Sequence, residues 1–162
     1  MRRLTGFLLA ALTLAADQWS KYLVLHPLHL QDGHLLVVLP VLNFVLVWNH
    51  GITFGMFAGT ASKVFLAAGA SAVVLGLFAW LWRTPHWVVT IAVAGITGGA
   101  IGNVLDRLRF GAVVDFIQVH AGGLYYPWVF NVGDSAIVCG VIALMLENLL
   151  HKPPVAANEG EG

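Results

Sequence analysis

Long runs of apolar residues, separated by shorter polar stretches, dominate the hydrophobicity pattern of the chain. Four of these runs, at about 4–25, 62–82, 87–108 and 134–150, are near the length of roughly 20 residues that a helix needs to cross a membrane. The fourth run is the shortest, and Phe130 to Val132 can extend it. The pattern therefore predicts a mainly α membrane protein with four transmembrane helices.

The connections between these runs differ in character. Residues 35–49, LLVVLPVLNFVLVWN, are rich in β-branched and aromatic side chains and are interrupted by Pro40, which predicts short strands with a break. Because this segment is too apolar for a free loop, we expect the 26–61 connection to lie on the membrane surface or to cover a site. The connection 83–86 is so short that the second and third spans must form an antiparallel hairpin.

The composition agrees with a membrane protein. Of the 162 residues, 59% are hydrophobic and only 10% are charged, against about a quarter in a soluble domain. The net charge of zero and the lack of a basic run give no sign of a nucleic-acid partner. The single cysteine, Cys139, excludes an intrachain disulfide. We expect one integral membrane domain over residues 1–152 and a disordered cytoplasmic tail over 153–162.

The N-terminal run permits two interpretations. The residues MRR followed by LTGFLLAALTLAA resemble a signal peptide, with Leu14 to Ala16 as a small-residue cleavage site. The apolar character resumes after Asp17 to Lys21, however, so the run can be followed to Leu25. We therefore favour a retained first span over a cleaved signal.

The distribution of basic residues predicts the orientation in the membrane. Four of them fall on each side: Arg2, Arg3, Arg83 and Lys152 on one, and Lys21, Lys63, Arg107 and Arg109 on the other. Lys21 and Arg107 lie inside apolar segments beside carboxylates, so they are better counted as site residues than as loop charges. The remaining bias places both termini in the cytoplasm, and residues 26–61 and 109–133 outside it.

With this topology, polar residues within and next to the spans fall at one depth, near the outer boundary of the membrane. Ionisable groups in apolar segments are costly unless they are paired, so they indicate a functional site. The candidates are Asp17, Lys21, Asn103, Arg107, Asp115 and Asp134.

Several of these residues also have a purely structural interpretation. Asp17 and Lys21 are four residues apart, and could form only an ion pair on one helix face. Asp134, which precedes an apolar run, is a good candidate for a helix N-cap. Asp106 points about a third of a turn away from the neighbouring arginine and is interpreted as structural.

Asp115 and Asp134 acquire a chemical meaning if they meet. Asp115 lies in VVDFIQV, where strand alternation would expose it and bury Val114 and Phe116. Two close carboxylates in a partly desolvated site cannot both ionise easily, so one of them keeps a proton. The ionised one can take a proton from water, while the protonated one polarises a carbonyl and then protonates the leaving amine. This predicts peptide hydrolysis without a metal, a cofactor or a covalent intermediate, and leaves open which aspartate is the base.

Other polar residues would support this chemistry. Asn49, Asn103 and Asn131 could donate hydrogen bonds to the substrate or to the developing oxyanion, and Arg107 could set the charge balance of the pair. The seven histidines are scattered over both sides without an HExxH spacing, so we expect no metal site. No GxSxG motif occurs in the sequence.

A competing hypothesis is a non-catalytic transporter or proton-path subunit that uses the same buried charges. Such a path needs ionisable groups through the whole depth of the membrane. The inner halves of the spans carry almost none, with Glu147 as the exception near an end. The sequence therefore favours the peptidase.

Four motifs in order make a specific pattern over residues 4–150. They are ADQWSK at 16–21, WNHGITFG at 48–55, GGAIGNVLDRLRFGAVVDFI at 98–117 and FNVGDSAI at 130–137. Together they resemble the lipoprotein signal peptidases, the type II signal peptidases of bacterial inner membranes. Two positions depart from the pattern: Gly133 stands where the family more usually has alanine, and Ile52-Thr53 where it commonly has two alanines.

The resemblance implies an aspartyl endopeptidase of the bacterial inner membrane. Its substrates would be prolipoproteins, cut just before a cysteine that carries a diacylglyceryl group, and membrane lipid would be its other partner. We expect a monomer. The catalytic aspartates would be Asp115 and Asp134, and the supporting residues Asp17, Lys21, Asn49, Asn103, Arg107 and Asn131. An outer β-cradle at 35–49 and a short periplasmic helix near TFGMFAG would complete the fold.

Overall fold

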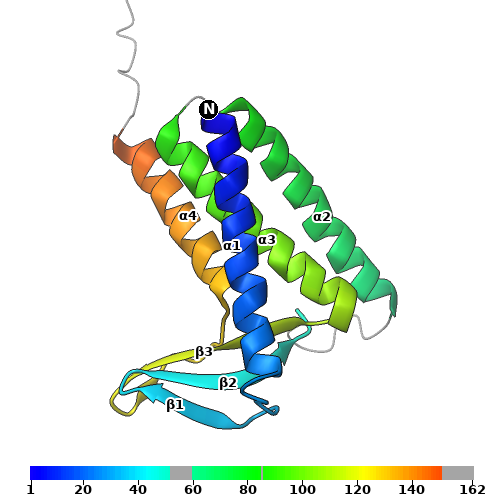
Figure 1. Cartoon of the computed structure of the whole chain (residues 1–162), viewed down its shortest axis with the longest axis vertical. Coiled ribbons are helices and arrows are strands. Elements are labelled where there is room, and N and C mark those ends of the chain that lie inside the picture. Colours follow the sequence, from blue (N-terminus) through cyan, green and yellow to red (C-terminus); the bar gives the residue numbers. More distant parts are fainter. Residues whose placement is uncertain (52–59, 85, 151–162) are drawn as a thin grey trace, which may run out of the picture.

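A computed structural model describes residues 1–51, 60–84 and 86–150 of the chain. It consists of a helical part and a small sheet at one end of the helices (Figure 1). The helices are α1 (Arg2–Leu25), α2 (Thr60–Arg83), α3 (Trp87–Phe110) and α4 (Val132–Leu150). The strands are β1 (Leu35–Leu39), β2 (Leu42–Asn49), β3 (Val113–Ala121) and β4 (Leu124–Tyr125).

The four helices coincide with the four predicted apolar runs to within a few residues. Two of them, Trp87–Phe110 and Val132–Leu150, are long and apolar enough to cross a membrane by length and composition. Within the described residues, the apolar stretch of α2 is the shorter segment Ala68–Arg83. The structure therefore confirms the helical architecture, and two of the four expected spans by these criteria.

Helix α3 is the centre of the helical part, because it contacts α1, α2 and α4 (Figure 1). Helices α2 and α3 run in opposite directions, as the short connection between them predicted. The start of α1 and the ends of α2 and α4 lie together at the end of the molecule opposite the sheet. There the Arg2 and Arg3 guanidinium groups lie over the rings of Trp87 and Trp82, at 5.6 and 5.1 Å from the ring centroids.

Glycines on α3 allow the neighbouring helices to approach closely. A Cβ atom on Gly98 would meet the Ala10 carbonyl and lie 2.7 Å from Cβ of Thr13 on α1. A Cβ atom on Gly99 would meet the carbonyl of Gly133 on α4. Small residues at such positions let two helix backbones approach closely within a membrane.

The sheet is antiparallel, with the strand order β1-β2-β3-β4. Strands β1 and β2 form a hairpin that turns at Pro40, where the sequence predicted a break. Strand β2 pairs with β3, which places Val47 opposite Asp115. This pairing joins two segments that are far apart in the sequence and places β3 in the sheet at the end of the helices.

A small apolar core fixes the sheet against α1. Its buried residues are Val24 from α1, Leu46 from β2, and Val114 and Phe116 from β3. Val114 and Phe116 flank Asp115 in the sequence. The packing of this core therefore fixes the position of the Asp115 carboxylate relative to the helices. The predicted short helix near TFGMFAG and the predicted disordered tail at 153–162 lie outside the described residues.

We predict that Gly98→Ala lowers the free energy of unfolding by about 1–3 kcal/mol, because the added methyl group would force α1 and α3 apart. Gly76→Ala on α2 is the matched control, since its Cβ would meet nothing within 4 Å and alanine favours helix. Unfolding of the purified protein in mixed micelles would measure both. Equal stability of the two variants would contradict the close contact between α1 and α3.

Candidate active site

Asp115 is the third residue of β3 and is only 1% exposed. The prediction that strand alternation would expose it is wrong. Both faces of β3 are covered at this point, because the sheet packs against the ends of the helices: Val114 and Phe116 face the apolar core, and Asp115 faces polar side chains from other elements. The carboxylate is thus removed from bulk water and held by hydrogen bonds.

Asp134 lies in the first turn of α4, but it is not the N-cap that the sequence suggested. The N-cap is Asn131, whose side-chain oxygen accepts a hydrogen bond from the Asp134 N–H at 2.8 Å. The Asp134 carboxylate in turn accepts from the Asn131 N–H at 3.3 Å. This reciprocal arrangement is a capping box, in which Asp134 occupies the third helical position. Its other carboxylate oxygen remains directed into the site.

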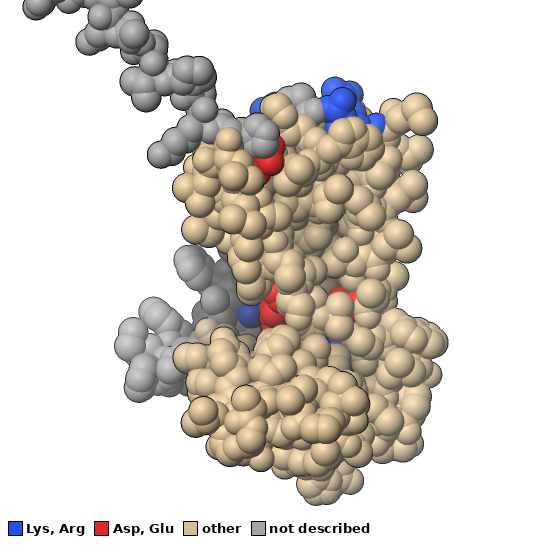
Figure 2. All heavy atoms as spheres, turned by 90° about the vertical axis from the view of Figure 1, so that its left-hand side faces the viewer, with Lys and Arg blue, Asp and Glu red and all other residues tan. Residues whose placement is uncertain are grey.

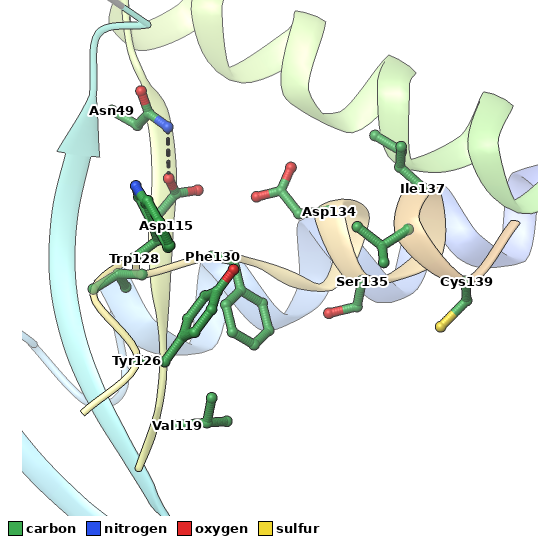
Figure 3. Close-up of a pocket in the computed structure, with 12 residues that line it drawn as sticks. Asn49, Asp115, Val119, Tyr126, Trp128, Phe130, Asp134, Ser135, Ile137 and Cys139 are labelled. Carbon is green, nitrogen blue, oxygen red and sulfur yellow. Dashed lines mark hydrogen bonds between the residues drawn. The ribbon is translucent and has the colours of Figure 1, made fainter. Parts of the chain in front are cut away.

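Three asparagine amides hold the two carboxylates. Asn49 at the end of β2 donates to Oδ2 of Asp115 at 2.9 Å, and Asn131 donates to Oδ1 of the same group at 2.7 Å. Asn103 on α3 donates to Oδ1 of Asp134 at 2.8 Å. The side chains of Asp115 and Asp134 point toward one another (Figure 3). The structure therefore brings all three predicted asparagines to the pair, where each amide already donates to a carboxylate.

Behind these amides lies a buried ion triad. The Lys21 ammonium on α1 is 2.8 Å from Oδ2 of Asp17 and 2.7 Å from Oδ2 of Asp106 on α3. It also donates to Oδ1 of Asn103 at 3.1 Å, which links the triad to the amides around the aspartate pair. Asp17 and Lys21 thus form the predicted i,i+4 ion pair as part of a larger network.

Asp106 is a member of this network that sequence reasoning left out of the site. Its carboxylate is 1% exposed and accepts from Lys21, from Gln18 on α1 and from the Val114 N–H on β3. The signal that could have found it was available, since Asp106 is an acidic residue inside an apolar helix, one turn from Asn103.

Arg107, in contrast, is not brought to the aspartates. Its guanidinium group donates to the backbone carbonyl of Asn103 at 3.3 Å, one turn back on α3. Among the described residues, no ion pair joins the Arg107 guanidinium group to a carboxylate. A role for Arg107 in the charge balance of the pair stays a prediction.

A cavity of about 590 Å³ opens beside the two aspartates. Acidic residues are visible in the hollow between the helical part and the sheet (Figure 2). The wall of the cavity is mainly apolar, and its lining residues include Val119, Tyr126, Trp128, Ile137 and Cys139 (Figure 3). Sequence reasoning missed these residues, because an apolar side chain in an apolar segment gives no signal of its own. The cavity suits an apolar chain whose polar backbone reaches the carboxylates.

The surroundings of Asp115 change its acidity. Burial raises the pKa of this carboxyl to about 6, and the neighbouring Asp134 charge raises it as well. The hydrogen bonds from Asn49 and Asn131 and the Lys21 charge act in the opposite direction, since they favour the ionised form. The raised pKa of Asp115 therefore means that burial outweighs its hydrogen bonds, and that the group keeps its proton to a higher pH than an ordinary aspartate.

Comparison with known proteins identifies the family of the chain. Residues 9–150 match the family model described as signal peptidase (SPase) II. The chain belongs to the signal peptidase II family. Signal peptidases II are aspartic proteases, so the chain is a membrane hydrolase rather than a transporter.

Individual relatives cover nearly the whole chain. Lipoprotein signal peptidases of Rhodopseudomonas palustris strain TIE-1 and Nitrobacter hamburgensis are 40% and 41% identical, and each alignment covers 94% of this chain and 96% of the relative. A bacterial membrane enzyme solved by the in meso method at 1.9 Å resolution superimposes with a TM-score of 0.80. It is 27% identical, and the match covers 91% of this chain and 94% of that one.

Gly133, one of the two departures from the family pattern, occupies a confined position in this signal peptidase. A Cβ atom there would lie 3.0 Å from both Oδ1 of Asp17 and the carbonyl oxygen of Gly99, which is tighter than ordinary van der Waals contact. Glycine therefore suits the close approach of α3 and α4 beside Asp134. The other departure, Thr53, lies outside the described residues.

The raised pKa of Asp115 predicts a pH-dependent stability. The folded state holds this proton more firmly than the unfolded chain, in which the carboxyl has its ordinary pKa of 3.8. The stability of the wild type relative to Asp115→Asn should therefore fall as the pH rises from about 4 to about 6, by at most about 3 kcal/mol, and then level off. Unfolding midpoints of both proteins across this range measure the effect.

Two further variants test the causes separately. Asp134→Asn removes a negative charge that raises the pKa of Asp115, so the pH range over which the stability falls should move to lower pH. Asn49→Ala removes a hydrogen bond that lowers the pKa of Asp115, so this pH range should move to higher pH. If the pH range is the same in both variants and the wild type, the proposed causes of the raised pKa of Asp115 are wrong.

Proposed function

We propose that the chain removes the signal peptides of bacterial prolipoproteins, with Asp115 and Asp134 as the catalytic pair. The bond it cuts would be the one before the diacylglyceryl-modified cysteine. The single observation that carries the proposal is the position of the two carboxylates, which come from a strand and a helix and face the same cavity of about 590 Å³. The names of the relatives support the substrate class, since they are lipoprotein signal peptidases.

In the proposed mechanism the two carboxyl groups share one proton. We place this proton on Asp115, because burial raises the pKa of that carboxyl. The ionised Asp134 then takes a proton from a water molecule, whose oxygen attacks the scissile carbonyl carbon. The protonated Asp115 donates to the carbonyl oxygen, and the pair returns a proton to the leaving amine when the C–N bond breaks.

The asparagines contribute by orienting the pair rather than by binding the oxyanion. Asn49 and Asn131 fix both oxygens of Asp115, and Asn103 fixes one oxygen of Asp134. A carboxylate that is held in this way loses little freedom when the substrate binds, which lowers the entropic part of the barrier. The oxyanion is then stabilised mainly by the proton on Asp115.

The apolar wall of the cavity supports the proposed substrate. Ile137, Val138 and Cys139 on α4 extend away from Asp134 along the helix, and Trp128 and Val119 lie across from them. A signal-peptide helix and a diacylglyceryl chain are both apolar and both reach the enzyme from the membrane. We propose that this wall receives them at the outer boundary of the membrane.

This assignment also fixes the proposed topology. All four helices would cross the inner membrane, with both termini in the cytoplasm and the sheet on the periplasmic surface. The basic residues Arg2, Arg3 and Arg83 lie at the end opposite the sheet, which supports this orientation. We propose that the enzyme acts as a monomer, because the cavity and both aspartates come from one chain.

We predict that Asp115→Asn and Asp134→Asn each abolish cleavage of a diacylglyceryl-modified prolipoprotein, since neither variant can share a proton between two carboxyl groups. The measurement is cleavage by purified enzyme in mixed micelles. Asp32→Asn, at an exposed acidic residue near the sheet, is the matched control and should retain activity. Full activity in either dyad variant would exclude the mechanism.

A second prediction concerns metal ions. Because the proposed reaction uses two carboxyl groups and water alone, incubation with EDTA and subsequent removal of the chelator should leave the cleavage rate unchanged. Loss of activity that returns when zinc or another divalent cation is added would contradict the proposal.

A further inference from the structure

Each proposed catalytic aspartate follows a residue whose backbone N–H is held by a buried carboxylate. The N–H of Val114, directly before Asp115, donates to Oδ2 of Asp106 at 3.1 Å. The N–H of Gly133, directly before Asp134, donates to Oδ1 of Asp17 at 2.8 Å. The two arrangements are equivalent, although one lies on a strand and the other at a helix start.

The two carboxylates that hold these N–H groups share one cation. The Lys21 ammonium binds Oδ2 of Asp17 at 2.8 Å and Oδ2 of Asp106 at 2.7 Å. All three residues are buried, with exposures of 0% for Asp17, 3% for Lys21 and 1% for Asp106. Because buried charges are stable only when paired, the position of the ammonium fixes the positions of both carboxylates.

The ammonium has no donor left for a substrate. A lysine ammonium has three N–H donors, and the acceptors around Lys21 are Asp17, Asp106 and Oδ1 of Asn103 at 3.1 Å. Asp106 is similarly occupied, since its second oxygen accepts from Gln18 at 3.0 Å. Because all three residues are also buried, the triad presents no accessible group to a substrate.

We propose that Asp17, Lys21 and Asp106 form a positioning unit that sets the separation of the two catalytic carboxylates through the backbone of Val114 and Gly133. This inference rests on the proposed function of the aspartate pair. Asp106 ties β3 to the outer end of α3, Asp17 ties the start of α4 to α1, and Lys21 holds the two ties at a fixed distance. None of the three residues touches the reacting atoms.

The test compares variants of the two carboxylates. Asp106→Leu removes the acceptor for the Val114 N–H, whereas Asp106→Asn keeps one oxygen for it. We expect Asp106→Leu to lower kcat by about 100-fold with KM changed less than about threefold, because a displacement of about 1 Å is enough to misalign the pair. Asp106→Asn should recover much of this loss. Asp32→Leu, the same exchange at an exposed acidic residue, is the matched control and should have the wild-type kcat.

A second measurement does not depend on activity. Hydrogen–deuterium exchange in micelles should show faster exchange of the Val114 amide in Asp106→Leu, while the Gly133 amide stays protected. Asp17→Leu should show the reverse. The value of kcat is calculated from the concentration of folded enzyme. A loss of folded protein alone therefore cannot produce the expected fall in kcat.

The outcomes separate the two proposals. If Asp115→Asn and Asp134→Asn are inactive but Asp106→Leu and Asp17→Leu have the wild-type kcat per folded enzyme, the positioning unit is excluded and the aspartate pair stands. If either asparagine variant of the pair is fully active, the proposed function itself fails. Equal exchange of both amides in the wild type and in the two leucine variants would also overturn the positioning unit.

Discussion

The pairing of one buried ammonium with two buried carboxylates is the constraint on which the rest of the structure depends. Lys21 lies in an environment where an unpaired charge is very costly, so Asp17 and Asp106 must both lie within hydrogen-bond distance of it. This requirement fixes α1 against α3. Through the N–H groups of Val114 and Gly133, it also fixes the strand and the helix that carry the aspartate pair.

A layer of neutral amides separates this charged triad from the aspartate pair. Asn103 accepts from Lys21 on one side and donates to Asp134 on the other, while Asn131 donates to both Asn103 and Asp115. The amides fix the positions of the two carboxylates relative to the triad, and they do so without placing a full positive charge in contact with either aspartate. Burial can then dominate at Asp115, whose pKa stays raised although a lysine lies nearby. An ammonium in direct contact would favour the ionised form of both carboxylates and disfavour the shared proton on which the proposed mechanism depends.

The sequence predicted the helices, the short strands interrupted at Pro40 and the candidacy of Asp115 and Asp134, because each of these leaves a local signal: a long apolar run, a β-rich segment with a proline, or a carboxylate where apolar residues are expected. It did not predict the burial of Asp115, because alternation describes one strand and the residues that contact this carboxylate, Asn49 and Asn131, come from β2 and the start of α4. It also misplaced the N-cap of α4. Asn131 and Asp134 fit the capping-box spacing, but an acidic residue at the edge of an apolar run is equally suited to the cap itself. Asp106 was left out because its partners lie on other elements.

Asn131 carries a consequence for how the enzyme is made. The same side chain accepts an N–H in the first turn of α4 and donates to the carboxylate on β3, so a single residue joins the start of the last helix to the strand that carries Asp115. All seven described elements that precede α4 in the chain, among them the strand with Asp115, are already synthesised by then. Translation order thus makes α4 the last element of the proposed site to be synthesised, and a chain that ends before residue 131 lacks one of the two proposed catalytic carboxylates.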